Sequence, residues 1–263
     1  MDAGLRDKVA LITGGSSGIG WGTALALAKE GVHIAVASRN PDSAAIKEIE
    51  AHGVRTLRLT IDVSREDEVV RMVKETVAGL GRLDLYVNNA AAHWDEPATK
   101  ITTEGWLNSI HTNLSACVWA CREVANHFVA HGGGSILIIG STASWNPLYK
   151  ETSYRVSKGG LKMYMEVLAI ELAPFGVRVN MISPGYFRTR LTAFFGGEQE
   201  KRMLDEIPLR RPARPEEIGS SAVLLLSDKL SSYTTGTELV VDGGAKLRPL
   251  PIYSDDEIRQ MSS

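Results

Sequence analysis

The sequence predicts an α/β protein built on one doubly wound parallel sheet of seven strands, with helices on both faces of the sheet. Short apolar runs of strand length alternate with longer segments of helical periodicity from the N-terminus nearly to the end of the chain. A glycine-rich turn joins the first apolar run to the first helical segment. The 263 residues, 44% of them hydrophobic, are enough to bury one sizeable core, and no second domain is needed.

The expected elements follow this alternation in chain order. The strands are short apolar runs, near residues 8–13, 32–38, 55–60, 83–87, 134–140, 177–182 and 237–241. The helices carry apolar residues at helical spacing, near residues 18–30, 42–52, 65–79, 103–131, 152–174 and 214–228. Right-handed crossovers between parallel strands then place a ligand across the carboxyl ends of the strands, at the point where the strand order reverses.

The turn after the first strand has the sequence Gly14-Gly15-Ser16-Ser17-Gly18-Ile19-Gly20. Glycines let the backbone approach a pyrophosphate closely, and the N-terminus of the following helix offers free N–H groups and a favourable dipole to the anion. Its spacing departs from the commoner Gly-x-Gly-x-x-Gly pattern. Strand, glycine-rich turn and helix together predict a Rossmann-type dinucleotide site.

A second pattern predicts chemistry. Tyr154 and Lys158 are four residues apart, which places both on one face of a helix, and Ser141 lies thirteen residues before the tyrosine. A nearby ammonium group favours the phenolate, so we expect Lys158 to lower the pKa of Tyr154. Such a phenol can give a proton to a ketone oxygen or take one from an alcohol, with Ser141 orienting that oxygen.

Two segments fall outside the alternation. Residues 185–212 form a long connection with Phe194 and Phe195 near its middle, and we interpret it as a lid over the substrate, because long connections in compact domains are usually functional or mobile. The C-terminal tail, residues 245–263, holds enough apolar residues to dock on the body of the protein or on a neighbouring subunit. No repeat or composition break marks a linker, so residues 1–263 are expected to form a single dinucleotide-binding and catalytic domain.

The overall charge excludes some partners. A net charge of -2 and a pI near 6.3 give no global basic field for nucleic acid or an anionic membrane surface. No leading apolar segment has signal-peptide form and no apolar run could span a bilayer, so a soluble, cytoplasmic protein is expected.

No metal site is expected. Cys117 and Cys121 lie one helical turn apart, a poor place for a structural disulfide, and are interpreted as buried packing residues. No further cysteine or well-spaced histidine completes a zinc set, since the histidines considered are scattered: His93, His111, His127 and His131.

Several motifs in one order carry a family resemblance. They are Thr13-Gly14-x-x-x-Gly18-Ile19-Gly20, Asp62-Val63, Asn88-Asn89-Ala90, Asn113, Ser141, Tyr154-x-x-x-Lys158, and Pro184-Gly185 with Thr189. From residue 5 to residue 245 the chain resembles the single-domain form of the short-chain dehydrogenase/reductase family. The resemblance implies an oxidoreductase that transfers hydride between a nicotinamide and a ketone or secondary alcohol.

The resemblance also implies a role for each matching residue. Tyr154 is the general acid/base, Ser141 orients the substrate oxygen, Lys158 holds the nicotinamide ribose, and Asn113 supports a water-mediated proton path to the lysine. The implied cofactor-binding residues are Gly14, Ser16, Ser17, Gly18, Ile19, Gly20, Ser38, Arg39, Asn40, Asp62, Val63, Asn89, Ala90, Ala91, Tyr154, Lys158, Pro184, Gly185 and Thr189.

The end of the second strand decides between the two nicotinamide cofactors. An acidic residue here binds the ribose 2′-hydroxyl of NAD, whereas an arginine accommodates the 2′-phosphate of NADP. This chain has Ser38 followed by Arg39, which favours NADP(H) over NAD(H). Two departures from the family pattern bear on the site. Ser17 stands where many NADP-using relatives have a basic residue, and Ala91 stands where relatives usually have glycine.

The substrate stays open at this level. We expect the pocket to draw on aromatic and neighbouring residues, namely His93, Trp94, Thr142 to Trp145, Tyr186, Phe187, Phe194 and Phe195. The alternatives to a simple ketone are a 3-oxoacyl thioester, a sugar or polyol, or a non-catalytic dinucleotide-sensing protein. A homotetramer is expected by resemblance, with apolar surface on two helices as its basis: Leu114, Cys117, Val118, Cys121, Val124, Leu161, Tyr164, Met165 and Leu168.

Overall fold

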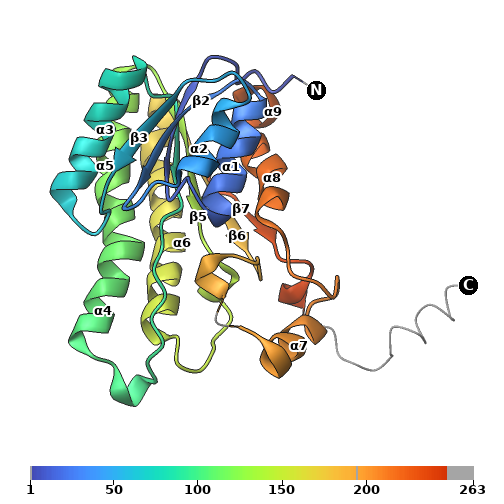
Figure 1. The fold of residues 1–263 in the computed structure, drawn as a ribbon. Helices are drawn as coiled ribbons and strands as arrows, with labels where there is room; N and C mark the ends of the chain where they lie inside the picture. The colour runs from blue at the N-terminus through green and yellow to red at the C-terminus, as the bar shows by residue number, and fades with distance from the viewer. Residues whose placement is uncertain (1, 194, 248–263) are drawn as a thin grey trace, which may run out of the picture.

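The computed structural model describes residues 2–193 and 195–247. A twisted parallel sheet lies between two layers of helices (Figure 1). Within the described chain the sheet has seven strands in the order β3-β2-β1-β4-β5-β6-β7, all parallel. The order reverses between β1 and β4, so a crevice opens beyond the carboxyl ends of these two strands. The predicted Rossmann-type α/β fold is confirmed.

The strand bounds differ from the predicted ranges by no more than two residues. Most strands are buried on both faces, which explains why they appear in the sequence as continuous apolar runs rather than as alternating ones. The strands are β1 Val9–Thr13, β2 His33–Ser38, β3 Thr56–Thr60, β4 Leu85–Asn88, β5 Gly134–Ile139, β6 Val177–Pro184 and β7 Glu238–Val241.

The helices also follow the expected ranges, with one subdivision. The helix expected at 103–131 consists of α4 and α5 joined without a break by one π-helical turn, His111–Ser115. Two short helices, α7 and α9, were not predicted. The helices are α1 Gly18–Lys29, α2 Ser43–Glu50, α3 Glu66–Leu80, α4 Thr103–Ile110, α5 Ala116–Ala130, α6 Thr152–Leu172, α7 Gly197–Asp205, α8 Gly219–Leu226 and α9 Asp228–Ser231.

The core has two parts, one on each face of the sheet. Apolar side chains of α3, α5 and α6 pack on one face, and those of α1, α2 and α8 pack on the other. Cys117 and Cys121 lie fully buried in the first part, as predicted; their Sγ atoms are 3.8 Å apart, in a weak hydrogen bond and not in a disulfide.

Most of the apolar residues named on these two helices as the basis for subunit pairing are core residues, so they do not supply an exposed surface. Six of the nine are buried against the sheet: Cys117, Cys121, Val124, Leu161, Met165 and Leu168. Apolar spacing alone does not tell which face of a helix meets the sheet. The apolar residues that α6 does expose are Val156, Met163, Val167 and Ile170, between 40% and 78% exposed.

The 185–212 segment is tethered at its base. Phe187 and Ala213 form a parallel bridge, in which Arg188 donates to the carbonyl oxygen of Ala213 and Ala213 donates to that of Tyr186, each over 2.9 Å. Between these points the chain carries a short turn, Arg190–Thr192, and α7. Figure 1 shows α7 projecting below the carboxyl ends of the strands. Of the predicted tail, only residues 245–247 fall within the described part of the chain. The predicted lid residue Phe194 lies outside it, whereas Phe195 lies within it.

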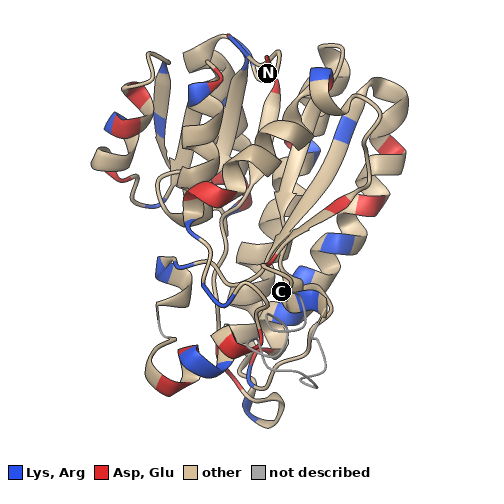
Figure 2. Ribbon diagram, turned by 90° about the vertical axis from the view of Figure 1, so that its right-hand side faces the viewer, with Lys and Arg blue, Asp and Glu red and all other residues tan. Residues whose placement is uncertain are grey.

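Charge is mixed over the surface. Figure 2 shows acidic and basic positions interspersed along the helices of the face it presents. Among the described helices, none is both long and apolar enough to cross a membrane.

Candidate active site

A cleft of about 590 Å³ opens beyond the carboxyl ends of the central strands. It is lined by the turn between β1 and α1, by the residues that follow β2, β3, β4 and β5, by the start of α6 and by the connection after β6. This is the place that the reversal in strand order predicts for a dinucleotide.

The glycine-rich turn is shaped for a close approach to a phosphate. Gly14 and Gly18 have φ values of +66° and +52°, a region that side chains other than glycine rarely occupy. A Cβ atom on Gly20 would collide with the carbonyl oxygen of Gly14 and with the side-chain amide of Asn89. The turn therefore needs glycine at these positions for both conformation and space, as a pyrophosphate cradle does.

Thr13 fastens this turn to the end of β4. Its hydroxyl accepts hydrogen bonds from the backbone N–H groups of Asn89 at 2.9 Å and Ala90 at 3.1 Å. The Asn89 side chain in turn donates to the carbonyl oxygen of Thr13 at 2.8 Å. These bonds hold the two sides of the crevice at a fixed separation.

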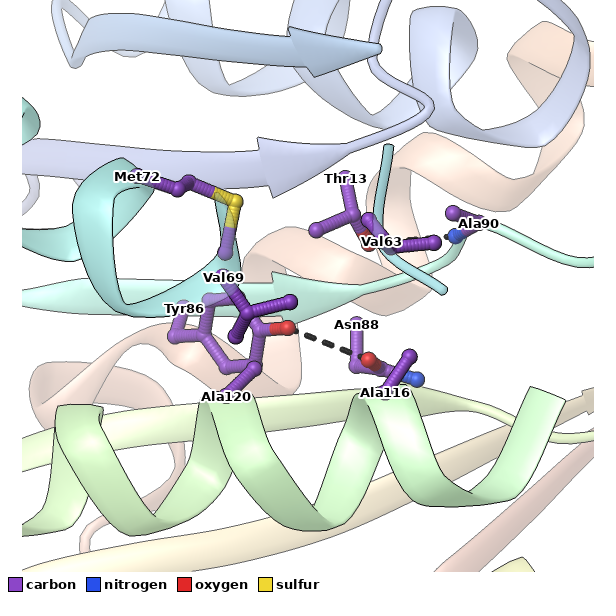
Figure 3. A pocket seen from close by; sticks show the side chains of 9 residues that line it. All are labelled: Thr13, Val63, Val69, Met72, Tyr86, Asn88, Ala90, Ala116 and Ala120. Carbon is purple, nitrogen blue, oxygen red and sulfur yellow. Dashed lines mark hydrogen bonds between the residues drawn. The ribbon is translucent and has the colours of Figure 1, made fainter. Parts of the chain in front are cut away.

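Side chains fill the space beneath the ends of β1 and β4. Tyr86 donates a hydrogen bond to Asn88 over 3.0 Å between α3 and α5, with Met72 and Val69 beside it (Figure 3). The buried network supports the ends of β1 and β4 from below.

Most of the predicted cofactor residues line the cleft. They are Gly14, Ser17, Gly18, Ile19, Ser38, Arg39, Asp62, Val63, Asn89, Ala90, Ala91, Tyr154, Lys158, Pro184, Gly185 and Thr189. Three predicted residues do not line it. Ser16 is buried, with its hydroxyl 3.4 Å from that of Ser38, Gly20 lies inside α1, and Asn40 is exposed beyond the end of β2. The residues present thus fit a nicotinamide dinucleotide.

At the end of the cleft beside β2 and β3, Asp62 is held by its own turn. Its carboxylate accepts hydrogen bonds from the backbone N–H of Ser64 at 3.0 Å and from the Ser64 hydroxyl at 2.7 Å. Arg39 is exposed at the rim of the same end of the cleft.

Three of the four predicted catalytic side chains, Ser141, Tyr154 and Lys158, line the opposite end. Tyr154 and Lys158 project from the first turns of α6, and Ser141 follows β5. The Lys158 ammonium nitrogen lies 5.8 Å from the centroid of the Tyr154 ring. It donates to the carbonyl oxygen of Ile139 over 3.1 Å, and burial lowers the pKa of Lys158 to about 8.

The predicted effect of Lys158 on Tyr154 is wrong for this structure. Burial raises the pKa of Tyr154 above its ordinary value; a hydrogen bond with Ser141 lowers it in part, the Glu151 carboxylate raises it, and the Arg155 guanidinium lowers it. Lys158 is not among these causes, since its ammonium group is directed to a backbone carbonyl and its own charge is disfavoured by burial. The phenol of Tyr154 is therefore protonated at neutral pH.

Asn113 lies in the π-helical turn between α4 and α5 and is almost fully buried. Its side-chain N–H groups donate to the carbonyl oxygen of Ala92 at 2.9 Å and to the hydroxyl of Ser157 at 3.1 Å, and its oxygen accepts from the N–H of Ala92 at 2.8 Å. Asn113 thereby ties the loop after β4 to α6. π-Helical turns are rare in proteins, and those that occur often lie at functional sites.

The substrate end of the cleft agrees only in part with the sequence interpretation. Trp94 and Phe187 line it as expected, whereas His93, Thr142 to Trp145 and Tyr186 do not. Trp145 packs against Lys246, whose ammonium lies 4.7 Å from its ring centroid, and Tyr186 stacks edge-on with Phe195 and donates to Glu200. The sequence interpretation did not name Asn108 and Thr112, which also line the cleft, whereas Leu191 and Thr192 line it from within the predicted lid. Asn108 and Thr112 lie one helical turn apart, directly before Asn113, and that spacing was an available signal.

Comparisons with known proteins agree with this geometry. Residues 14–246 match a family model described as enoyl-(acyl carrier protein) reductase. The short chain dehydrogenase/reductase astE of Aspergillus oryzae is 36% identical over 92% of this chain and 96% of its own length. The 3-oxoacyl-[acyl-carrier-protein] reductase FabG of Staphylococcus epidermidis is 33% identical over 90% of this chain and 98% of its own length.

Solved structures show the same fold. A short-chain type dehydrogenase/reductase from Mycobacterium marinum superposes with a TM-score of 0.86 at 34% identity, covering 92% of this chain and 96% of that one. An NAD+-bound xylitol dehydrogenase has a TM-score of 0.85 at 28% identity, covering 91% of this chain and 99% of that one. The NADPH-dependent 3-quinuclidinone reductase of Rhodotorula rubra gives 0.83 at 29% identity over 92% of each chain.

These matches run over nearly the whole chain. They therefore include both the glycine-rich cleft and the Ser141, Tyr154 and Lys158 side chains at its end. The chain belongs to the short-chain dehydrogenase/reductase family, whose members are NAD(P)-dependent oxidoreductases acting on CH–OH groups and the corresponding carbonyls.

Proposed function

We propose that this protein is an NADP(H)-dependent oxidoreductase that interconverts a ketone and a secondary alcohol, with Tyr154 as the general acid/base. One observation carries the proposal. Ser141 and Tyr154 come from different elements, the end of β5 and the start of α6, yet both line the same end of the cleft with Lys158 beside them.

The side chains have distinct tasks in the reaction. When bound, the nicotinamide supplies or accepts the hydride. Ser141 orients the substrate oxygen, and Tyr154 gives its phenolic proton to that oxygen in reduction or takes the hydroxyl proton in oxidation. Lys158 holds the ribose, and Asn113 fixes the loop of Ala92 that faces the cleft.

The raised pKa of Tyr154 favours one direction. A carbonyl reductase needs a protonated phenol, and burial keeps Tyr154 protonated at neutral pH. An alcohol dehydrogenase needs the phenolate, which this environment disfavours. We therefore propose that ketone reduction is the faster direction at neutral pH.

The choice of NADP(H) rests on the end of β2. Arg39 borders the cleft beside Ser38, and neither supplies the carboxylate that would bind a ribose 2′-hydroxyl and repel a 2′-phosphate. The similar solved structures include both an NAD+-bound enzyme and an NADPH-dependent one, so membership of the family does not decide between the two cofactors. Titration of the protein with NADPH and NADH, followed by nicotinamide fluorescence, tests the assignment.

A 3-oxoacyl thioester is a second candidate substrate, favoured by relatives named as 3-oxoacyl reductases. A substrate panel separates the candidates: acetoacetyl coenzyme A for thioesters, a cyclic ketone for simple carbonyls, and xylitol for polyols. Oxidation of NADPH, or reduction of NADP+ for xylitol, is followed by absorbance. If none is turned over while the dinucleotide still binds, the non-catalytic alternative is favoured.

We also propose that residues 185–212 act as a lid and that the protein is a homotetramer. The lid proposal is supported by Leu191 and Thr192, which belong to this segment and line the cleft. The assembly proposal is supported by the exposed apolar stripe on α6, since a second copy would remove it from water. Light scattering at micromolar concentration tests the assembly.

A further inference from the structure

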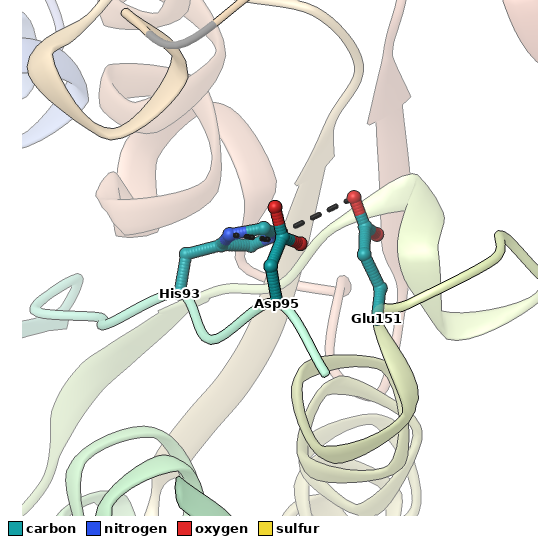
Figure 4. Close-up of side chains that lie close together, drawn as sticks. All are labelled: His93, Asp95 and Glu151. Carbon is teal, nitrogen blue, oxygen red and sulfur yellow. Dashed lines mark ion pairs between the residues drawn. The ribbon is translucent and has the colours of Figure 1, made fainter. Parts of the chain in front are cut away.

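A charged cluster lies next to Tyr154, outside the residues that line the cleft. Glu151 directly precedes α6 and is only 6% exposed. One carboxylate oxygen lies 3.3 Å from Nε2 of His93, and the other lies 2.7 Å from the Arg155 guanidinium. The second ring nitrogen of His93 lies 3.7 Å from the carboxylate of Asp95, which is half exposed (Figure 4).

The histidine of this cluster touches Tyr154. The two ring centroids are 5.0 Å apart and the planes meet at 61°, an edge-on contact. Aromatic pairs favour this geometry over a face-to-face sandwich. His93 comes from the loop after β4, so it bridges that loop, the start of α6 and the reactive side chain.

Hydrogen bonding explains the cluster better than metal coordination. His93, Asp95 and Glu151 are close enough together to hold a metal ion. However, each ring nitrogen of His93 faces a different carboxylate, and the second oxygen of Glu151 is taken by Arg155. The contact between Nε2 of His93 and Glu151 is within hydrogen-bond distance, whereas Asp95 is close enough only for an ion pair.

The carboxylate of Glu151 is ionised despite its burial. Burial raises the pKa of Glu151, but His93 and Arg155 together outweigh it and leave the pKa below its ordinary value. Burying a charged group is costly unless it is paired, and this group is fully paired. The charged and titratable groups around Tyr154 are thus Glu151 directly before α6, Arg155 on α6, His93 on the β4 loop, and Lys158 one turn further along α6.

We propose that His93 and Glu151 form a positioning pair for the acid/base: Glu151 anchors the imidazole, and the imidazole holds the phenol ring of Tyr154 facing the cleft. Neither residue needs to touch the substrate for this role, which agrees with the absence of both from the residues that line the cleft. The inference rests on the proposed function of Tyr154.

The first experiment changes only the charge of Glu151. In Glu151→Gln the side chain keeps its shape, and removal of the negative charge stabilises the phenolate, so the tyrosinate absorbance of Tyr154 appears at lower pH than in the unmodified protein. Subtracting the spectrum of Tyr154→Phe isolates this residue, and no substrate is required. Glu75→Gln is the matched control, because Glu75 also pairs with an arginine four residues away, at the exposed surface of α3.

The second experiment removes the tether and keeps the ring. His93→Phe retains an aromatic side chain against Tyr154 but cannot bond to Glu151. With acetoacetyl coenzyme A and a cyclic ketone as probes, kcat falls about three- to thirtyfold while the Kd for NADPH is unchanged. His93→Gln restores a donor to Glu151 and recovers part of the loss. In the double variant His93→Phe/Glu151→Gln the loss is no greater than that of the worse single variant, because both changes break the same contact.

The outcomes separate the two proposals. If Tyr154→Phe keeps most of the activity, the proposed function itself fails. If Tyr154→Phe is inactive but Glu151→Gln leaves the tyrosinate titration where it was, or the double variant loses the product of the two single losses, only the positioning pair is wrong. A rise in activity on adding Zn²⁺, lost in Glu151→Gln, would replace the positioning pair by a metal site. Circular dichroism of each variant confirms folding. If His93→Phe does not fold, the tyrosinate titration of Glu151→Gln is the test of the positioning pair.

Discussion

Lys158 donates its hydrogen bond to the carbonyl oxygen of Ile139, 3.1 Å away. Lys158 is only 3% exposed, and this burial lowers the pKa of its ammonium group from 10.5 to about 8. The unfolded chain therefore binds this proton more tightly than the folded one between about pH 8 and 10.5, so the free energy of unfolding contributed by Lys158 rises with pH across that window. Below pH 8 the charge costs about 3 kcal/mol of stability.

Lys158→Met is accordingly expected to stabilise the protein at neutral pH while removing its activity. The gain of about 3 kcal/mol is offset by about 1–2 kcal/mol for the lost bond to Ile139, which leaves a rise in Tm of a few degrees. Calorimetry at pH 7 and pH 9 measures the effect. The gain should be larger at pH 7 than at pH 9, and equal gains at both would mean that the charge is not the cause.

Tyr154→Phe should lower kcat by about 10²- to 10⁴-fold and leave the Kd for NADPH within about threefold, because only the ionisable hydroxyl is lost. Stopped-flow absorbance with the best ketone of the panel measures kcat. Tyr149→Phe, five residues earlier and 77% exposed, is the control and should retain full activity.

The double change Ser38→Asp and Arg39→Ala tests the cofactor assignment. A guanidinium bonded to a 2′-phosphate is worth roughly 1.5–3 kcal/mol, so NADPH should bind about ten- to a hundredfold more weakly, while NADH gains a carboxylate for its 2′-hydroxyl. Fluorescence titration gives both Kd values. Arg122→Ala, which changes an exposed arginine of α5 paired with Glu66 at the start of α3 and outside the residues that line the cleft, should change neither. Tighter binding of NADH than NADPH by the unmodified protein would reverse the assignment.

The assembly proposal predicts that Ile170→Glu lowers the molar mass in solution. Ile170 is 78% exposed within the apolar stripe of α6, and a carboxylate buried against a second copy would lack a partner. Light scattering compares this variant with Leu209→Glu, which introduces the same charge at another exposed apolar position. Monomer mass for the unmodified protein would end the proposal.

Local patterns in the sequence were sufficient for the fold and for finding the residues that line the cleft at its proposed catalytic end. Each strand was a short apolar run, because parallel strands are covered on both faces. Gly14, Gly18 and Gly20 identified the dinucleotide turn, since conformation and space exclude other residues there. Tyr154 and Lys158 could be paired because a helix fixes the relation between positions four apart.

Only the tertiary structure decided the environment of these residues. Burial determines the direction in which the pKa of Tyr154 moves, and the carbonyl of Ile139 competes for Lys158. His93 and Glu151 are 58 positions apart, yet the ends of β4 and α6 bring them together behind the phenol. The face of α6 that meets the sheet likewise decided which apolar residues are core. Burial, solvation and contacts between distant segments depend on how whole elements pack, and the spacing of residues along the chain does not contain that information.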